Sequence, residues 1–357
     1  MRKFNYILLL AMVFLTACNK ASVRRTPVAK DETFNGIYFW RTTFDVNAKE
    51  RAFLKEHKID RLYLRLFDVD VAQQNLLEIT QPTPIATIIF PDSVATAQTV
   101  SLVRDIVPVA FITLPALKGM RFAEKEYALK LVTRMLNMSS YHQFRDKVTE
   151  IQIDCDWTPS TEHIYFALLG EMQELLKNEK VSLSATIRLH QLRTAPPPAD
   201  KGVLMVYNTG SIKESKTVNS ILAVEDAAQY LSHNAVEKYK LPLDYAFPTF
   251  SWAVWFRGNQ YLGLLHRDNY ENPHYYSVID STHFEVLHPH VIEERCLQKG
   301  DIIRLEKSEY ETIIKTKSLL PFAGNRHSII LYHLDANKLK DYESEKIDNL
   351  YCHSDRN

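Results

Sequence analysis

The chain has 357 residues, 46% of them hydrophobic, and its 43 Lys and Arg balance its 43 Asp and Glu. This composition supports a large core but no global field that would attract nucleic acid, so we predict no nucleic-acid partner. Only 9 glycines are present, and neither G-x-x-x-x-G-K nor G-x-G-x-x-G occurs, so we predict no nucleotide cofactor. No spacing of Cys and His resembles a zinc site, and no bound metal is predicted.

The first 18 residues have the pattern of a secretory signal peptide. A short basic region precedes an apolar run at 7–15, which is shorter than the roughly 20 residues that span a bilayer. The run ends in Leu15-Thr-Ala-Cys18, which resembles a bacterial lipobox. We therefore expect a lipoprotein anchored through Cys18 to a membrane of the bacterial cell envelope, either periplasm-facing or at the cell surface. Residues 19–33 are then a flexible tether, and 34–357 form the folded part.

Short apolar strands and helical stretches alternate along the rest of the chain. Such alternation is typical of parallel strands with helical crossovers. Strands are predicted at 36–42, 61–67, 84–90, 107–113, 151–158, 181–188, 202–208, 243–247 and 327–333, and helices at 47–58, 124–144, 161–178, 224–238 and 308–316.

Eight strand–helix units over roughly 300 residues predict an α/β fold, a (β/α)₈ TIM barrel. One strand is spare, either 84–90 or 107–113. Residues from about 252 to 305 are rich in aromatic and charged side chains without a clean period, and we interpret them as an insertion or small subdomain after strand seven. A doubly wound open sheet is the alternative, although no phosphate-binding turn is visible.

The most informative segment is 151–158, in which apolar and polar residues alternate. A period of two on a strand places Asp154 and Asp156 on the same face. Two neighbouring carboxylates cost repulsion and desolvation, so this pattern indicates a polar site. The structural alternative is a salt-bridged layer with Arg65 or Arg188.

In a (β/α)₈ barrel the functional site lies at the C-terminal ends of the strands. Here those ends carry polar and aromatic residues, whereas strand beginnings such as Ile37, Leu62 and Val203 are apolar. Carboxylates, guanidinium groups and rings at one mouth can bind a carbohydrate or glycan. The predicted catalytic residues are Asp154 and Asp156, and the predicted sugar contacts are Trp40, Arg41, Arg65, Asp68, Arg188, Tyr207, Asn208 and Trp252.

Ile153-Asp-Cys-Asp-Trp-Thr-Pro159 is similar to the strand-four signature of the family 18 glycoside hydrolases, the chitinase-like barrels, which reads Asp-x-x-Asp-x-Asp-x-Glu. Leu204-Met-Val-Tyr207 resembles their strand-six Met-x-Tyr, and Leu183-Ser-Ala-Thr186 resembles their fifth strand. The resemblance covers roughly residues 150–210. It implies a barrel that acts on carbohydrate, with Asp154 and Asp156 supporting the general acid and orienting the substrate's acetamido group.

The sequence also departs from that signature. The resemblance implies a general-acid Glu at the position of Thr158, and the first Asp of the signature falls on Ile151. A threonine hydroxyl is far too weak an acid to replace a carboxylic acid near neutral pH.

Three functions remain open. Hydrolysis of a glycosidic bond is the first hypothesis, with Asp156 as the acid/base and a second carboxylate across the mouth. A non-catalytic glycan-binding or scaffold lipoprotein is the second, and a metal-assisted hydrolase that uses Asp68 and Asp70 with Asp154 is the third. The candidates for the second carboxylate are Asp68, Asp70, Asp244 and Asp335.

Overall fold

The computed structural model describes residues 33–71, 81–265, 269–322 and 327–352. The predicted signal peptide, Cys18 and most of the predicted tether lie outside the described residues. Among the residues described, no helix combines the length and the apolar character that are needed to cross a membrane.

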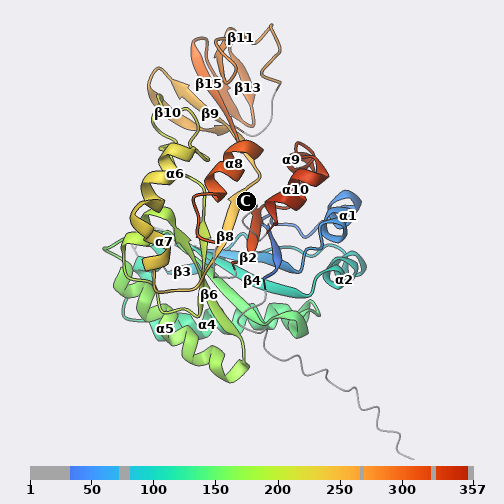
Figure 1. The fold of residues 1–357 in the computed structure, drawn as a ribbon, viewed down its shortest axis with the longest axis vertical. Coiled ribbons are helices and arrows are strands. Elements are labelled where there is room, and N and C mark those ends of the chain that lie inside the picture. Colours follow the sequence, from blue (N-terminus) through green and yellow to red (C-terminus); the bar gives the residue numbers. More distant parts are fainter. Residues whose placement is uncertain (1–32, 72–80, 266–268, 323–326, 353–357) are drawn as a thin grey trace, which may run out of the picture. The chain divides into compact units, whose positions relative to one another are not determined.

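Eight parallel strands close into a barrel (Figure 1). Each strand pairs with the next along the chain, and the last strand pairs with the first, which completes the ring. The (β/α)₈ barrel predicted from the sequence is therefore confirmed. The strands are β1 (Asn35–Phe39), β2 (Arg61–Val71), β4 (Asp105–Ile112), β5 (Glu150–Asp154), β6 (Ser182–Arg188), β7 (Lys201–Met205), β8 (Leu243–Pro248) and β16 (Ile329–Tyr332).

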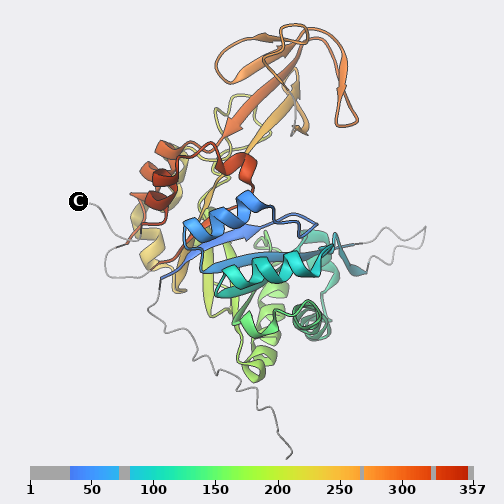
Figure 2. The same cartoon turned by 90° about the vertical axis from the view of Figure 1, so that its right-hand side faces the viewer.

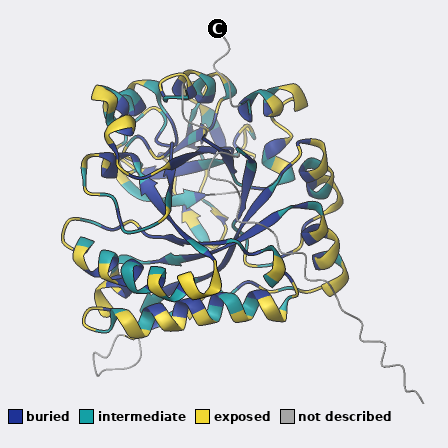
Figure 3. Cartoon of the chain, turned by 60° about the horizontal axis from the view of Figure 1, so that its bottom comes forward, coloured by how far each residue is buried: buried dark blue, intermediate teal, exposed yellow. Residues whose placement is uncertain are grey.

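Helices surround this ring, as Figures 1 and 2 show. Figure 3 shows that the strands are buried while the helices expose their outer faces. The helix α1 begins with a capping box, in which Asn47 and Glu50 satisfy each other's backbone N–H groups. The helices are α1 (Ala48–Glu56), α2 (Ser93–Leu102), α3 (Leu114–Gly119), α4 (Glu124–Tyr141), α5 (Glu162–Glu179), α6 (Val224–Leu231), α7 (Ala235–Lys238), α8 (Tyr310–Lys317), α9 (Ala336–Leu339) and α10 (Ser344–Leu350).

The structure identifies the spare strand, divides one predicted helix, and contains α2, α3, α9 and α10, which the sequence analysis did not predict. The spare strand is β3 (Pro82–Ile85), which pairs antiparallel with β2 outside the ring, so the 107–113 segment supplies the barrel strand. The predicted helix at 224–238 is divided into α6 and α7, because His233 and Asn234 both have left-handed backbone angles, with φ of 60° and 56°. A continuous right-handed helix cannot include two such residues.

An antiparallel sheet is inserted between β8, the seventh strand of the barrel, and α8, where the sequence predicts an insertion. Its strand order is β10-β9-β15-β12-β11, and a separate hairpin joins β13 to β14. The strands are β9 (Ser251–Arg257), β10 (Gln260–Leu265), β11 (Tyr276–Val278), β12 (His283–Val286), β13 (His290–Ile292), β14 (Arg295–Leu297) and β15 (Asp301–Lys307).

The interior of the barrel is charged at its N-terminal end. Arg61 at the start of β2 forms ion pairs with Glu150 (2.7 Å) and Asp105 (3.4 Å). On the opposite strands, Lys201 pairs with Asp244 at 2.5 Å. The expectation of an apolar interior at the strand beginnings holds for Val203, which packs inside the barrel, but is wrong for Ile37 and Leu62. Those two belong to the core between strands and helices, and the residues beside them point inward.

Candidate functional site

The two predicted catalytic carboxylates lie in different environments. Asp154 ends β5 and is 5% exposed, whereas Asp156 follows the strand with 54% of its side chain exposed. Cys155 and Trp157 point the opposite way and are buried. The indole of Trp157 packs against Tyr165 and Phe166 of α5, so the alternation in this segment serves both a polar mouth and an apolar core.

Arg188, at the end of β6, bridges both carboxylates. One of its terminal nitrogens lies 3.2 Å from Asp154 Oδ1, and its Nε donates to Asp156 Oδ1. The hydroxyl of Thr186 donates to Asp154 Oδ1 at 2.6 Å. Burial raises the pKa of Asp154 above its usual value, although Arg188 and Thr186 counteract this shift. Burial alone would lower the pKa of Arg188, but the adjacent Asp154 and Asp156 raise it overall.

Aromatic rings from four elements meet beside these charges. Tyr332, at the end of β16, lies at their centre, with its ring centroid 5.5 Å from Tyr38, 5.6 Å from Trp40, 5.5 Å from Tyr207 and 5.7 Å from Phe250. We call these five residues the aromatic mouth cluster. Their side chains extend the inward-facing rows of the barrel, because residues two apart on a strand share a face.

The structure brings most of the predicted sugar contacts to this mouth. Arg65 pairs with Asp68 (Nε–Oδ1 2.7 Å), and its guanidinium group lies 5.7 Å from the ring centroid of Trp40. Trp252 on β9 reaches the cluster through Phe250, at a centroid distance of 5.0 Å. Asn208 is exposed just after β7, with φ of 55°.

Arg41 is the exception. Its guanidinium group makes two hydrogen bonds to Glu50 of α1, at 3.1 and 2.8 Å, so the expectation that Arg41 lies at the mouth is not met. The reason is the period of the strand: Arg41 is one residue beyond Trp40, and its side chain therefore points toward the surrounding helices.

The four candidates for a second carboxylate each have another partner. Asp68 pairs with Arg65, and Asp70 accepts from Thr113 at 2.7 Å. Asp335 caps α9 through the backbone of residue 337. Asp244 pairs with Lys201 at the opposite end of the barrel, which removes it from the mouth altogether. Asp68 interacts electrostatically with the predicted catalytic pair, because its charge contributes to the raised pKa of Asp154.

Within the described ranges, no group of three or more His, Cys, Asp or Glu side chains is arranged to hold a metal ion. Thr158 stands at the position where the resemblance implies a general acid, and its polar groups are engaged within the protein. The backbone N–H of Thr158 donates to Thr161 Oγ1 at 3.0 Å, and the Thr158 hydroxyl lies 2.9 Å from that of Ser160. Thr158 thus belongs to the turn that precedes α5.

Sequence reasoning missed three members of the aromatic mouth cluster as site residues: Tyr38, Phe250 and Tyr332. Tyr38 could have been found, because it lies two residues before Trp40 on the same strand. Tyr332 is visible in the sequence only as a strand-end residue. Phe250 follows β8 in a segment without a regular period, and only the folded chain places it.

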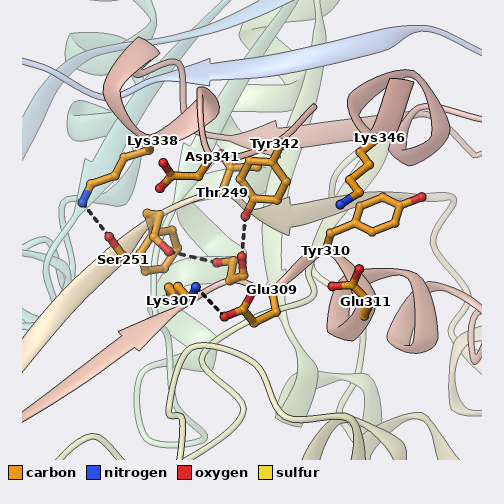
Figure 4. Close-up of a pocket in the computed structure, with 12 residues that line it drawn as sticks. Thr249, Ser251, Lys307, Glu309, Tyr310, Glu311, Lys338, Asp341, Tyr342 and Lys346 are labelled. Atoms are coloured by element: carbon orange, nitrogen blue, oxygen red, sulfur yellow. Dashed lines mark hydrogen bonds and ion pairs between the residues drawn. The ribbon is translucent and has the colours of Figure 1, made fainter. Parts of the chain in front are cut away.

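A small polar pocket lies beside the mouth (Figure 4). Its volume is about 100 Å³, and Phe250 lines it as well as contacting the mouth. Several of its polar groups are paired within the protein: Lys338 with Ser251 at 2.5 Å, Lys307 with Glu309 at 2.8 Å, and the Tyr342 hydroxyl with the backbone carbonyl of residue 308 at 2.6 Å.

No protein-family profile and no curated protein match the chain significantly. Solved structures do. The Bacillus cereus spore cortex-lytic enzyme SleL has a TM-score of 0.55 at 13% identity, covering 91% of this chain and 75% of that one. The GH18 chitinase ChiB of Flavobacterium johnsoniae has a TM-score of 0.53 at 11% identity, covering 90% and 94%.

The chitinase-like agglutinin RobpsCRA of Robinia pseudoacacia has a TM-score of 0.50 at 12% identity, covering 89% of this chain and 99% of that one. At these identities the likeness is one of fold. Together with the eight-stranded parallel ring, it shows that this chain has a (β/α)₈ barrel fold similar to that of these chitinases.

Proposed function

We propose that the barrel mouth binds a carbohydrate chain without cleaving it by the family 18 mechanism. The aromatic mouth cluster beside the bridged carboxylates carries this proposal. Rings can pack against the apolar faces of sugars, while carboxylate and guanidinium groups hydrogen-bond to hydroxyls. The solved chitinases of the same fold support the choice of carbohydrate as ligand.

Two observations favour binding over hydrolysis. Thr158 occupies the position where the resemblance implies a general acid, and its hydroxyl is engaged in a turn. Arg188 donates hydrogen bonds to the buried Asp154 and to the exposed Asp156, which holds the Asp156 carboxylate in one place as an acceptor for sugar hydroxyls. A barrel of this fold that is named an agglutinin supports the same proposal.

Calorimetry and product analysis with the N-acetylglucosamine tetrasaccharide, a chitin fragment, test the proposal. We expect saturable binding and no shorter saccharides after prolonged incubation. Asp156→Asn should weaken binding roughly tenfold or more, because it removes a charged acceptor of sugar hydroxyls. Asp280→Asn is the matched control, since Asp280 is also half exposed (53%) but lies in the inserted sheet.

Turnover of the tetrasaccharide would overturn the non-hydrolytic part of the proposal. Failure of the wild-type protein to bind this probe, chitin or peptidoglycan would overturn the carbohydrate proposal as a whole. An equal loss of affinity in both Asn variants would show that the effect does not come from the mouth.

We also propose that the protein is lipid-anchored in the bacterial cell envelope. The basic start, the apolar run and Cys18 in the lipobox-like sequence support this localisation. Expression of wild-type protein and the Cys18→Ser variant, followed by membrane fractionation and fatty-acid labelling, tests it. The wild type should be labelled and membrane-bound, and the variant unlabelled; an unlabelled wild type would contradict the proposal.

A further inference from the structure

The inserted sheet contains a buried ion pair on the face that adjoins the barrel. The side chains of Arg304 and Glu306 are both 0% exposed, and Arg304 Nε lies 2.7 Å from Glu306 Oε1. Removing two charges from water is costly, and a pair of this kind is tolerated only where further hydrogen bonds complete both groups. Those additional partners show what the pair holds together.

Glu306 binds two groups with its second oxygen. Oε2 accepts from the indole N–H of Trp252 at 2.7 Å and from the hydroxyl of Ser220 at 2.5 Å. Trp252 is directly opposite Glu306 in the pairing of β9 with β15, so their side chains lie on the same face of the sheet. The carboxylate thus fixes the orientation of a ring that the sequence already indicates as a sugar contact.

Arg304 binds the loop that leaves β7 just after Tyr207. Its guanidinium group donates to the backbone carbonyls of Glu214 (2.7 Å), Ser215 (3.3 Å) and Ile212 (3.3 Å). The ion pair therefore joins the inserted sheet to a loop at the C-terminal end of the barrel, where the aromatic mouth cluster lies.

We propose that Glu306, charge-balanced by Arg304, is a positioning residue for the glycan site, because it holds the Trp252 indole and the loop after β7 against the aromatic mouth cluster. The ring contacts are continuous, from Trp252 to Phe250 and on to Tyr332. This inference rests on the proposed carbohydrate function, and it assigns a role to two residues that make no ligand contact themselves.

The same pair of strands provides an internal control. The indole N–H of Trp255 donates to Asp301 Oδ2 at 2.8 Å, and Arg257 Nε donates to Asp301 Oδ1 at 2.8 Å. This second set of Trp, carboxylate and Arg has the same chemistry. Trp255 packs in the hydrophobic core of the inserted sheet, however, and has no ring contact with the aromatic mouth cluster.

Calorimetry with the N-acetylglucosamine tetrasaccharide on Trp252→Phe, Glu306→Gln and Trp255→Phe tests the proposal. Trp252→Phe keeps a ring and removes the hydrogen bond, and we expect it to weaken binding roughly fivefold, the effect of losing one orienting hydrogen bond. Glu306→Gln should weaken binding by at least as much. Trp255→Phe should stay within roughly twofold of wild type, because it loses a hydrogen bond of the same kind at a ring that packs in the core of the inserted sheet and not against the mouth. Equal losses in both Phe variants, or none in Trp252→Phe, would overturn the positioning role.

A second readout does not depend on the ligand. In protein labelled with 5-fluorotryptophan, the four tryptophans give fluorine resonances, of which Trp252→Phe identifies one. Glu306→Gln should shift or broaden the Trp252 resonance and leave that of Trp255 unchanged. An unaltered Trp252 resonance would refute the role of Glu306, whereas wild-type protein that fails to bind any saccharide would refute the proposed function instead.

Discussion

Both ends of the barrel contain ion pairs, but the charged side chains at the N-terminal end are buried, whereas one carboxylate at the C-terminal mouth is exposed. At the N-terminal end, the side chains of Arg61, Glu150 and Asp105 are 5% exposed or less. At the mouth, Arg188 binds one buried carboxylate and one that is 54% exposed, Asp156. Charge inside a barrel is therefore not by itself a sign of a site; a charge that remains accessible at the C-terminal end is.

An aromatic ring also covers the charges at the N-terminal end of the barrel, which we call the closed end. The ring of Phe34 lies 4.0 Å from the Arg61 guanidinium carbon and 4.9 Å from Lys201 Nζ, measured to the ring centroid. Cation–π contacts of this kind stabilise charges that have little access to water. At the mouth, the rings of Trp40, Phe250 and Tyr332 are only partly buried and adjoin the exposed Asp156, whereas Tyr38 and Tyr207 are buried beneath them.

The largest effect should come from breaking the ion pairs at the closed end. Glu150→Ala leaves the buried Arg61 guanidinium short of its closest partner, and we expect a loss of about 3–5 kcal/mol in the free energy of unfolding. Urea unfolding followed by circular dichroism measures it. Glu179→Ala is the control, since its exposed pair with Arg145 should contribute less than about 1 kcal/mol. Similar losses in the two variants would contradict the contrast.

A substitution in the middle of the barrel should have an intermediate effect on the free energy of unfolding. The Tyr38 hydroxyl donates to Gln152 Oε1 at 2.7 Å, and Gln152 Nε2 donates to Ser184 Oγ at 3.2 Å, all in the interior. Tyr38→Phe leaves a buried amide oxygen unpaired, which should cost about 1–3 kcal/mol by urea unfolding. A loss below about 0.5 kcal/mol would indicate that the amide finds another donor.

The pH dependence of stability sharpens the comparison at the mouth. Because burial raises the pKa of Asp154 in the folded state above the unfolded value of 3.8, the folded state holds the proton more tightly. The contribution of Asp154 to stability should therefore improve as the pH falls through the folded pKa, and level off below about pH 3.8. The difference in unfolding free energy between wild type and Asp154→Asn, measured from neutral pH to about pH 4, should shift in favour of wild type. A difference that does not change with pH would contradict the raised pKa.

The smallest effect on stability should come from the exposed carboxylate. Asp156→Asn should change the free energy of unfolding by less than about 1 kcal/mol, because half-exposed ion pairs contribute little. The same variant should lose affinity for the tetrasaccharide, so stability and binding separate at this residue. A loss of several kcal/mol would instead place Asp156 with the structural ion pairs at the closed end.

Much of the barrel could be predicted from local patterns. Alternation along 151–158 places Asp154 on the inner face and Trp157 beneath α5, and the structure agrees. The same pattern failed at the beginnings of several strands, where inward residues such as Arg61 and Asp105 are charged. Arg61 and Asp105 become acceptable inside only when a third strand supplies Glu150, and no local pattern shows that partner.

Local patterns were sufficient to predict the order of the barrel strands, the position of the insertion and the shared face of Asp154 and Asp156, because period-two alternation acts over a few residues. The choice of Arg188 over Arg65 as their partner came from the fold. Tertiary structure alone decided that Tyr38, Phe250 and Tyr332 join one cluster and that Arg41 turns away from it. It also brought Glu306 to Trp252 and Ser220, residues 54 and 86 positions apart. Closure of the ring and docking of the inserted sheet create these contacts, and their geometry depends on every strand at once.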